Sequence, residues 1–157
     1  MFSLIAAIGK NRELGKNGQL IFRIKEDMQF FRQTTLHHTI LMGHKTWDSL
    51  PGKLKDRQNL VVARNPVPGA DQTITDLPAF IAAHQHSPEE IFVIGGGMVY
   101  FELIPYATTL YLTEVDTTDP DADTFFPQFD KSLFTRQIIK KGSDHGLDYT
   151  FVKYHKI

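Results

Sequence analysis

Short apolar runs recur along the chain, and each of them is too short for a typical helix. Runs of this kind, bounded by glycine, proline or asparagine, are typical of strands that are buried on both faces of a parallel sheet. They predict strands at Phe2 to Ile8, His38 to Met42, Gln58 to Ala63, Thr73 to Thr75, Ile91 to Ile94 and Leu110 to Val115.

Segments with apolar residues three or four positions apart lie between these runs and predict helices. The predicted helices span Ile24 to Thr35, Lys45 to Leu50, Leu77 to His84 and the residues that follow Gly97. The segment Gly9 to Arg23 is rich in glycine and asparagine and is expected to be a long surface loop. Leu133 to Lys141 and Asp148 to Lys156 predict a β-hairpin with a long turn between them.

This alternation predicts an α/β fold. We expect one central mixed, mostly parallel sheet of about eight strands, with flanking helices and an antiparallel C-terminal hairpin. No linker, internal repeat or low-complexity segment interrupts the pattern, so residues 1–157 are expected to form a single domain.

Composition narrows the class of protein further. Apolar residues make up 41% of the chain and charged residues 22%, as in globular proteins. The net charge of −1 and the lack of a basic cluster argue against nucleic acid or an anionic membrane as partner. The absence of cysteine excludes disulfides and thiolate chemistry, and no other ligand pattern predicts a metal site. No signal peptide or membrane span is expected, which favours the cytoplasm.

Three consecutive glycines, Gly95 to Gly97, stand between a predicted strand and a predicted helix. They remove every β-carbon at the end of the strand, so that another backbone or a ligand can approach closely. The helix that follows directs free N–H groups and its positive dipole end at the same place. The motif therefore predicts a binding site for an anion, most often a diphosphate, although a tight turn without a ligand would show the same pattern.

One acidic residue is out of place in the helix predicted at Ile24 to Thr35. Asp27 belongs to the apolar stripe formed by Ile24, Met28 and Phe31, where a carboxylate is costly unless it is hydrogen-bonded or functional. It could simply tilt to solvent at the edge of the helix. The functional interpretation is a carboxylate in an apolar cleft that grips a cationic or amidine-like ligand, with its pKa raised by burial.

The chain resembles the bacterial dihydrofolate reductases in an ordered series of motifs. The series comprises Ser3 to Ala7, Gly15 and Gly18 before a helix with Glu26-Asp27, Met42 to Leu50, Arg57, Val93 to Tyr100, Leu110 to Thr113 and Asp123 to Pro127. The resemblance covers nearly the whole chain. It implies a monomer that reduces dihydrofolate to tetrahydrofolate with NADPH, by hydride transfer to C6 and protonation of N5, in support of one-carbon metabolism.

The resemblance implies a substrate pocket around Asp27. The Asp27 carboxylate is expected to bond the 2-amino group and the adjacent nitrogen of the pterin, with Thr113 bonded to the carboxylate or to its water. Arg57 is expected to fork onto the α-carboxylate of the glutamate tail. The remaining substrate contacts implied by the resemblance are Ile5, Ala6, Met28, Phe31, Leu50, Leu54, Ile94 and Tyr100.

The resemblance also implies an NADPH site at the glycines. A cis peptide bond is expected between Gly95 and Gly96, and His44 and Arg64 are expected to meet the 2′-phosphate. The full set of implied cofactor contacts is Ala7, Leu14, Gly18, Leu20, Gly43, His44, Lys45, Thr46, Ser49, Val62, Ala63, Arg64, Ile94, Gly95, Gly96, Gly97, Met98, Val99 and Tyr100.

The sequence departs from the family pattern in three places. Leu20-Ile21-Phe22 replaces the usual Leu-Pro-Trp of the mobile loop, so Leu20 and Phe22 stand in its catalytic positions but the indole N–H is missing. His44 replaces the commoner arginine, and its phosphate contact should weaken above about pH 6.5. The segment 116–123 is about one residue longer than expected, which bears on the contact of Asp123 with the loop at Gly9 to Arg23.

Two other functions remain open on the sequence. One is a reductase of the same fold that acts on a pyrimidine such as a riboflavin precursor, and Asp27 with Arg57 argues against it. The other is a nucleotide-binding homologue without catalytic activity, which the retained polar residues disfavour.

Overall fold

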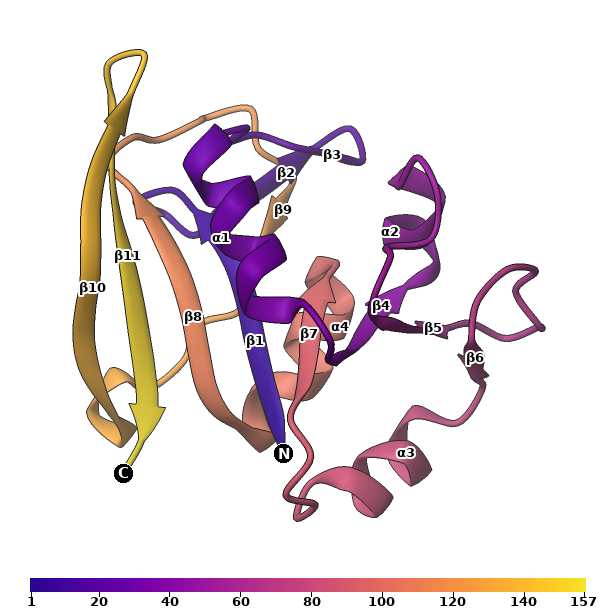
Figure 1. The fold of residues 1–157 in the computed structure, drawn as a ribbon. Coiled ribbons are helices and arrows are strands. Elements are labelled where there is room, and N and C mark those ends of the chain that lie inside the picture. Colours follow the sequence, from indigo (N-terminus) through magenta and orange to yellow (C-terminus); the bar gives the residue numbers. More distant parts are fainter.

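A central sheet of eight strands organises the molecule, which a computed structural model describes over residues 1–157. The strand order is β10-β11-β8-β1-β7-β4-β5-β6 (Figure 1). These strands are β1 (Phe2–Ile8), β4 (Thr39–Gly43), β5 (Gln58–Val62), β6 (Gln72–Ile74), β7 (Ile91–Gly95), β8 (Ala107–Val115), β10 (Phe134–Asp144) and β11 (Leu147–Lys156). All neighbours pair in parallel except β11, which is antiparallel to both β8 and β10. The predicted fold is confirmed.

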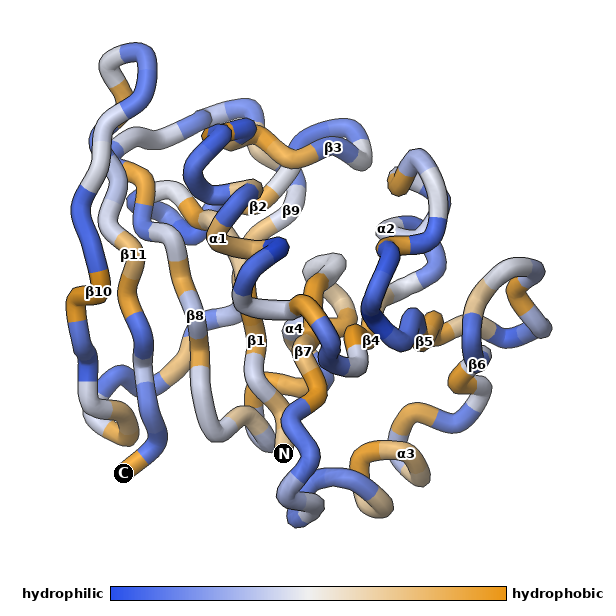
Figure 2. The backbone as a smooth tube through the Cα atoms, in the orientation of Figure 1, coloured by the Kyte–Doolittle hydropathy of each residue, from blue (hydrophilic) through white to orange (hydrophobic).

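Helices cover both faces of this sheet. Phe31 of α1 (Lys25–Thr35) and Trp47 of α2 (His44–Ser49) pack on one face, against the cluster that contains Ile5. On the other face, α3 (Leu77–His84) and α4 (Gly97–Leu103) contribute to the main core, and two short 3-10 turns follow at Ile104–Tyr106 and Lys131–Leu133. Figure 2 shows apolar residues concentrated in the central strands, as expected for strands covered on both sides. No helix is long and apolar enough to cross a membrane.

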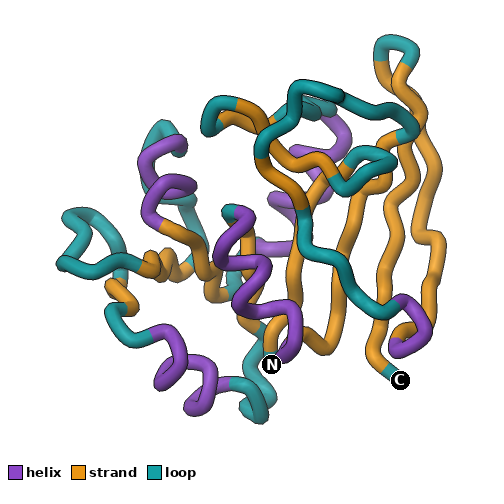
Figure 3. The backbone as a smooth tube through the Cα atoms, turned by 180° about the vertical axis from the view of Figure 1, so that it is seen from behind, coloured by secondary structure: helices purple, strands orange, loops and turns teal.

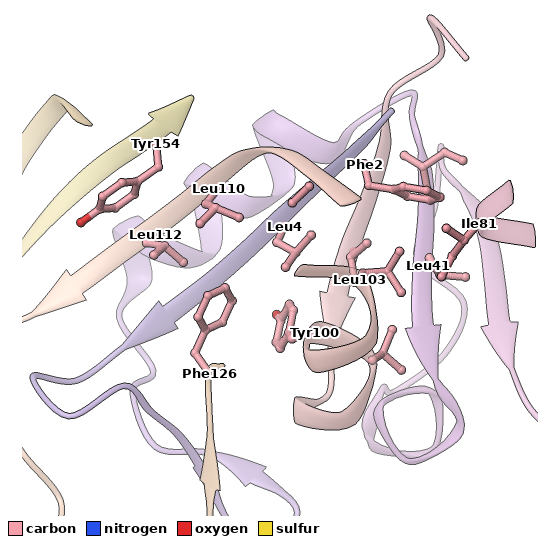
Figure 4. Close-up of a cluster of buried hydrophobic side chains, with 14 of the residues drawn as sticks. Phe2, Leu4, Leu41, Ile81, Tyr100, Leu103, Leu110, Leu112, Phe126 and Tyr154 are labelled. Carbon is pink, nitrogen blue, oxygen red and sulfur yellow. The ribbon is translucent and has the colours of Figure 1, made fainter. Parts of the chain in front are cut away.

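The main core lies between the sheet and α4. Leu4 of β1, Leu110 of β8 and Leu103 of α4 are fully buried there, and Figure 4 shows them packed around the rings of Tyr100 and Phe126. The centroids of these two rings are 5.1 Å apart. Because α4 begins at Gly97, two residues after the end of β7, this packing holds the end of β7 in place relative to β1.

The segment Gly9 to Arg23 is not a simple surface loop, so that prediction is wrong. It contains β2 (Glu13–Lys16) and β3 (Gln19–Leu20), which join β9 (Thr124–Phe125) in a second, antiparallel sheet of order β3-β2-β9. Figure 3 shows this small sheet from behind. Its backbone groups pair with a segment more than a hundred residues away in the sequence, and no local pattern reveals that pairing.

The C-terminal hairpin has a tighter turn than predicted. Strands β10 and β11 extend to Asp144 and Leu147, so only His145 and Gly146 connect them. Both residues have positive φ angles, 50° and 81°, which is typical of the two-residue turns that join twisted strands. The pairing of β10 with β11 also shifts register between Ile138 and Lys140.

Candidate functional site

Asp27 faces the sheet from the first turn of α1. The hydroxyl of Thr113, on β8, donates a hydrogen bond to Asp27 Oδ1 at 2.5 Å. Burial raises the pKa of Asp27, and the Thr113 bond opposes that rise because it favours the ionised form. The carboxyl group is therefore turned inward, as the functional interpretation expects, and its second oxygen has no protein partner in the structure.

The buried face of α1 differs from the stripe seen in the sequence. Met28 is 62% exposed, whereas Phe30 stacks on Phe151 of β11 with ring centroids 4.8 Å apart. Asp27, Phe30 and Phe31 are spaced as neighbours on one helical face, and this face meets the sheet. The helix is thus rotated so that the carboxylate, rather than Met28, points inward.

Apolar side chains gather beside Asp27 on the same face of the sheet. They form one cluster around buried residues of β1, β4, β5 and β7. Five of the residues expected to contact substrate belong to it, namely Ile5, Phe31, Leu50, Leu54 and Ile94. Ala6 packs against the main core on the other face of the sheet. The structure therefore brings most of the expected apolar contacts together.

The glycines at the end of β7 form a corner at which three segments converge. The Gly95–Gly96 peptide bond is cis, as expected, and Gly95 has a φ of 123°, which side-chain-bearing residues rarely adopt. Met42 of β4 pairs with Gly95, so Gly43 lies beside the corner. A β-carbon on Gly43 would lie 3.2 Å from Val99, and one on Gly96 would lie 3.5 Å from Thr46 Oγ1. We call Gly43 with Gly95 to Val99 the glycine corner.

The backbone at the glycine corner offers unpaired donors. Gly96 is the N-cap of α4 and provides no side-chain hydrogen bond to the first turn. The first N–H groups of this helix therefore lack intrahelical partners. Gly43 lies close to them, since a β-carbon on Gly43 would be 3.8 Å from the Gly96 nitrogen. With no β-carbons in the way, these donors suit a close-fitting anion such as a diphosphate.

Tyr100 connects the glycine corner to the Asp27 pocket. Its hydroxyl donates to the backbone oxygen of Ile5 at 2.6 Å, and its side chain is 4% exposed. Burial raises the pKa of Tyr100, and the negative charge of Asp27 raises it further. The phenol stays neutral and ties α4 to β1 between the two parts of the site.

Arg57 stands apart from Asp27, beyond the apolar cluster. Its Nη1 donates to Thr35 Oγ1 at 3.2 Å and its Nε donates to the Lys55 oxygen at 2.9 Å. Desolvation and the nearby charge of Arg32 lower the pKa of Arg57. The remaining guanidinium donors are available for a carboxylate.

The polar residues expected around the cofactor phosphates lie mostly at the surface. His44, Lys45 and Arg64 are exposed, and His44 Nε2 lies 3.6 Å from Asp48 Oδ1 on the next turn of α2. The Ser49 hydroxyl donates to the Thr46 oxygen within α2 at 2.6 Å. At the end of β5, Val62 and Ala63 are half-buried.

The residues expected from the mobile loop have different surroundings. Leu14 is buried in the main core and Phe22 packs with Ile24 and Val115 in a separate cluster, whereas Leu20 is 64% exposed. Gly18 has a φ of 74°, with open space where a β-carbon would lie. The structure therefore does not bring Leu20 and Phe22 into one environment.

Contacts between this loop and the segment 116–123 are present. The Asn17 N–H donates to Asp123 Oδ2 at 2.9 Å, which matches the expected role of Asp123. Glu13, which the sequence patterns did not single out, is 1% exposed and accepts the N–H groups of Asn11 and Asp119, both at 2.7 Å. Glu13 lies among polar and basic residues in the sequence, so no local pattern distinguishes it from a surface glutamate.

Comparisons with known proteins point to one family. A family model described as dihydrofolate reductase matches residues 1–156. The dihydrofolate reductase of Bacillus subtilis is 34% identical over 99% of this chain and 95% of its own, and that of Neisseria gonorrhoeae is 35% identical over 97% and 96%. A solved dihydrofolate reductase from Enterococcus faecalis, in complex with NADP(H) and RAB-propyl, superposes with a TM-score of 0.87 at 27% identity and covers 99% of this chain and 96% of its own.

Proposed function

The chain belongs to the dihydrofolate reductase family, and we propose that Asp27, Thr113 and the glycine corner carry out its activity, the NADPH-dependent reduction of dihydrofolate to tetrahydrofolate. The observation that carries the proposal is the half-buried carboxyl group of Asp27, held by Thr113 beside an apolar cluster. A pterin presents an amino group and a ring nitrogen side by side, and a carboxylate can bond both.

Asp27 orients the pterin and sets its electronic state. Thr113 fixes one carboxyl oxygen, which leaves the other to face the ring. A raised pKa lets Asp27 share a proton with the ring nearer to neutral pH than an ordinary aspartate could. Because Asp27 binds the side of the ring away from N5, we infer that water delivers the N5 proton. Phe22 has no N–H and packs in a separate cluster, so it orders no such water.

The apolar cluster supplies the walls of the substrate pocket. Ile5, Ile94 and Phe31 flank the ring, whereas Leu50 and Leu54 lie toward Arg57 and contact the benzoyl group. Ala6, Met28 and Tyr100 complete the proposed set. The free donors of Arg57 bind the α-carboxylate of the glutamate tail, because a guanidinium matches a carboxylate in a bidentate geometry.

The glycine corner fits a dinucleotide. NADPH supplies the hydride for C6 when it is bound. The backbone of Gly95 to Val99 holds its diphosphate, since the glycines leave the N–H groups at the start of α4 open to a close-fitting anion. Lys45 and Thr46 approach from α2, and His44 and Arg64 contact the 2′-phosphate. The other proposed contacts are Ala7, Leu14, Gly18, Leu20, Ser49, Val62, Ala63, Ile94 and Tyr100.

We also propose that residues 1–157 act as one domain, in a monomer, in the cytoplasm and without a nucleic-acid partner. The net charge of −1 supports the last point. Light scattering coupled to gel filtration tests the monomer, and a stable dimer at micromolar concentration would contradict it.

An assay of cofactor oxidation tests the function. We expect the absorbance of NADPH to fall when dihydrofolate is added, and to fall more slowly when NADH replaces NADPH. Turnover with a pyrimidine substrate in place of dihydrofolate would support a different reductase of the same fold. Tight NADPH binding without turnover would support an inactive nucleotide-binding homologue.

A further inference from the structure

A bridge of three side chains joins the first turn of α1 to the C-terminal hairpin. Tyr149 of β11 donates its hydroxyl proton to Glu26 Oε1 at 2.7 Å, and Lys140 of β10 pairs with Glu26 Oε2. We call these residues the hairpin bridge. Glu26 immediately precedes Asp27, so the bridge acts on the turn of helix that carries the Asp27 carboxyl group.

The hairpin directs Lys140 toward α1 through a break in its register. Ile138 pairs with Val152, but Lys140 pairs with Phe151, so β10 has one extra residue between them. Side chains alternate along a strand, and a regular ladder would place Lys140 on the same face as Arg136 and Ile138. The bulge turns Lys140 to the opposite face, where α1 lies, and bulges are common where a side chain must be redirected.

Gly142 provides the space that the hairpin bridge needs. Gly142 pairs with Tyr149 across the hairpin. A β-carbon at Gly142 would lie 2.6 Å from the Tyr149 ring and 2.7 Å from Glu26 Oε1, closer than real contacts allow. The sequence of β10 is therefore adapted at two positions, Lys140 and Gly142, to the contact between Tyr149 and Glu26.

The start of α1 depends on tertiary contacts. Ile24, its N-cap residue, makes no side-chain hydrogen bond to the first turn. Glu26 and Asp27 each bond a strand of the sheet instead, Glu26 to the hairpin and Asp27 to β8. Lys140 and Tyr149 lower the pKa of Glu26, whereas burial raises the pKa of Asp27. The pKa values of these adjacent carboxyl groups are thus shifted in opposite directions, and the shift of Glu26 favours its charged form beside Lys140.

We propose that the hairpin bridge is a positioning device for the reaction. By fixing the rotation of the first turn of α1, Glu26, Lys140 and Tyr149 aim the Asp27 carboxyl group at the substrate. The inference rests on the proposed role of Asp27. None of the three bridge residues need touch substrate or cofactor.

The same hairpin provides a matched control on its other face. There Glu114 of β8 accepts the Tyr154 hydroxyl at 2.7 Å and pairs with Arg136 Nη2 at 2.6 Å. This trio has the same chemistry, a glutamate held by a cation and a tyrosine. It lies on the face of the sheet opposite α1, because Tyr154 belongs to the main core. Losing it should affect stability but not Asp27.

The experiment compares Y149F and E26Q with Y154F and E114Q. We measure the hydride-transfer rate in single-turnover assays over a range of pH, the KM for dihydrofolate, and the melting temperature. Small displacements of a reacting group reduce rates, so Y149F and E26Q should slow hydride transfer roughly three- to ten-fold. Y154F and E114Q should leave the rate unchanged, even if they melt at lower temperature.

The pH profile separates positioning from general loss of stability. Thr113 from β8 bonds Asp27, and Tyr100 from α4 and Tyr149 from β11 are close enough for the charge of Asp27 to raise their pKa values. Glu26 precedes Asp27 on its own helix and is turned toward the hairpin. E26Q removes a negative charge beside Asp27, so the midpoint of the rate profile should move to lower pH. Y149F keeps every charge and should change the rate with a smaller movement of the midpoint.

Two outcomes would overturn the proposal. One is normal hydride transfer in both Y149F and E26Q, and the other is a loss that the control variants share in proportion to their melting temperatures. If Y149F fails to fold, E26Q decides alone. D27N is measured in parallel: if D27N is inactive while the bridge variants are normal, only the bridge proposal fails, whereas an active D27N refutes the proposed role of Asp27, and a parent chain that does not reduce dihydrofolate refutes the proposed function.

Discussion

The Asp27 pocket and the glycine corner differ in the groups that would bind a ligand. In the pocket, a charged side chain is placed among apolar ones, and Thr113 and burial together set its protonation. In the glycine corner, backbone N–H groups are the donors for a ligand, and the absence of β-carbons lets the ligand approach them. The pocket should therefore be sensitive to changes of charge, and the corner to changes of volume.

The two regions also differ in how they are held. The glycine corner is anchored by α4, which packs on the main core through Val99, Tyr100 and Leu103. Asp27 sits on a helix with only Thr35 fully buried, so its position relies on polar contacts with the strands. Substitutions that leave the fold intact should distinguish a site held by apolar packing from a site held by polar contacts.

The largest effect should come from D27N, which removes the charge and keeps the shape. We expect turnover near neutral pH to fall by about a hundred-fold or more, since the amide cannot share a proton with the ring. NADPH affinity, which depends on the glycine corner, should change little. Steady-state kinetics and a cofactor titration measure the two quantities, and near-normal turnover would remove Asp27 from the mechanism.

D27N should also change how stability depends on pH. Burial raises the pKa of Asp27, so folding favours the protonated carboxyl, and this stabilisation is lost as pH rises through the raised pKa. Asparagine has no such loss. The melting temperature of D27N relative to the parent chain should therefore be higher at about pH 8 than at about pH 4, and the opposite trend would contradict a raised pKa of Asp27 in the folded chain.

The next largest effect should come from G95A in the glycine corner. Alanine is strained at a φ of 123°, and its β-carbon would lie 3.4 Å from the Tyr100 ring. A strain of about 1–3 kcal/mol corresponds to roughly five- to 150-fold weaker NADPH binding if the corner rearranges. G52A is the matched control, because Gly52 has open space around it. Equal NADPH affinity in both variants would contradict the assignment of the diphosphate to the glycine corner.

A smaller effect is expected from R57K, which keeps the positive charge but loses the bidentate geometry of the guanidinium group. We expect the KM for dihydrofolate to rise about ten-fold with little change in kcat, because the lost contact is equally present in ground and transition states. A pterin substrate without the glutamate tail should be reduced equally well by both enzymes. An unchanged KM for dihydrofolate would refute the contact.

The smallest effect concerns His44 and the choice of cofactor. Asp48 competes for His44, whose Nε2 lies 3.6 Å from Asp48 Oδ1. A guanidinium binds phosphate in a bidentate geometry, so we expect H44R to raise the preference for NADPH over NADH by a few-fold. Binding titrations of both cofactors test this, and an unchanged preference in H44R would exclude position 44 from the 2′-phosphate site.

Much of the fold and part of the site could be predicted from local sequence. The helix at Leu77–His84 lies within its predicted bounds, because Asp76 caps it and Pro78 suits its first turn. The glycine corner was recognisable because it is a contiguous motif. The small sheet of β2, β3 and β9 and the two-residue turn of the hairpin were missed, because long-range pairing specifies the former and the strand bounds specify the latter.

The sequence by itself determined the succession of the helices and of the strands of the central sheet, the three glycines at the end of β7 and the suspicion that Asp27 is out of place, since periodicity and contiguous motifs are local properties. Only the tertiary structure decided that Asp27 turns inward while Met28 is exposed, and that a bulge aims Lys140 at Glu26. The reason is that these outcomes depend on partners far along the chain, 86 residues away for Thr113 and 123 for Tyr149. Burial and hydrogen bonding are settled where those distant segments meet.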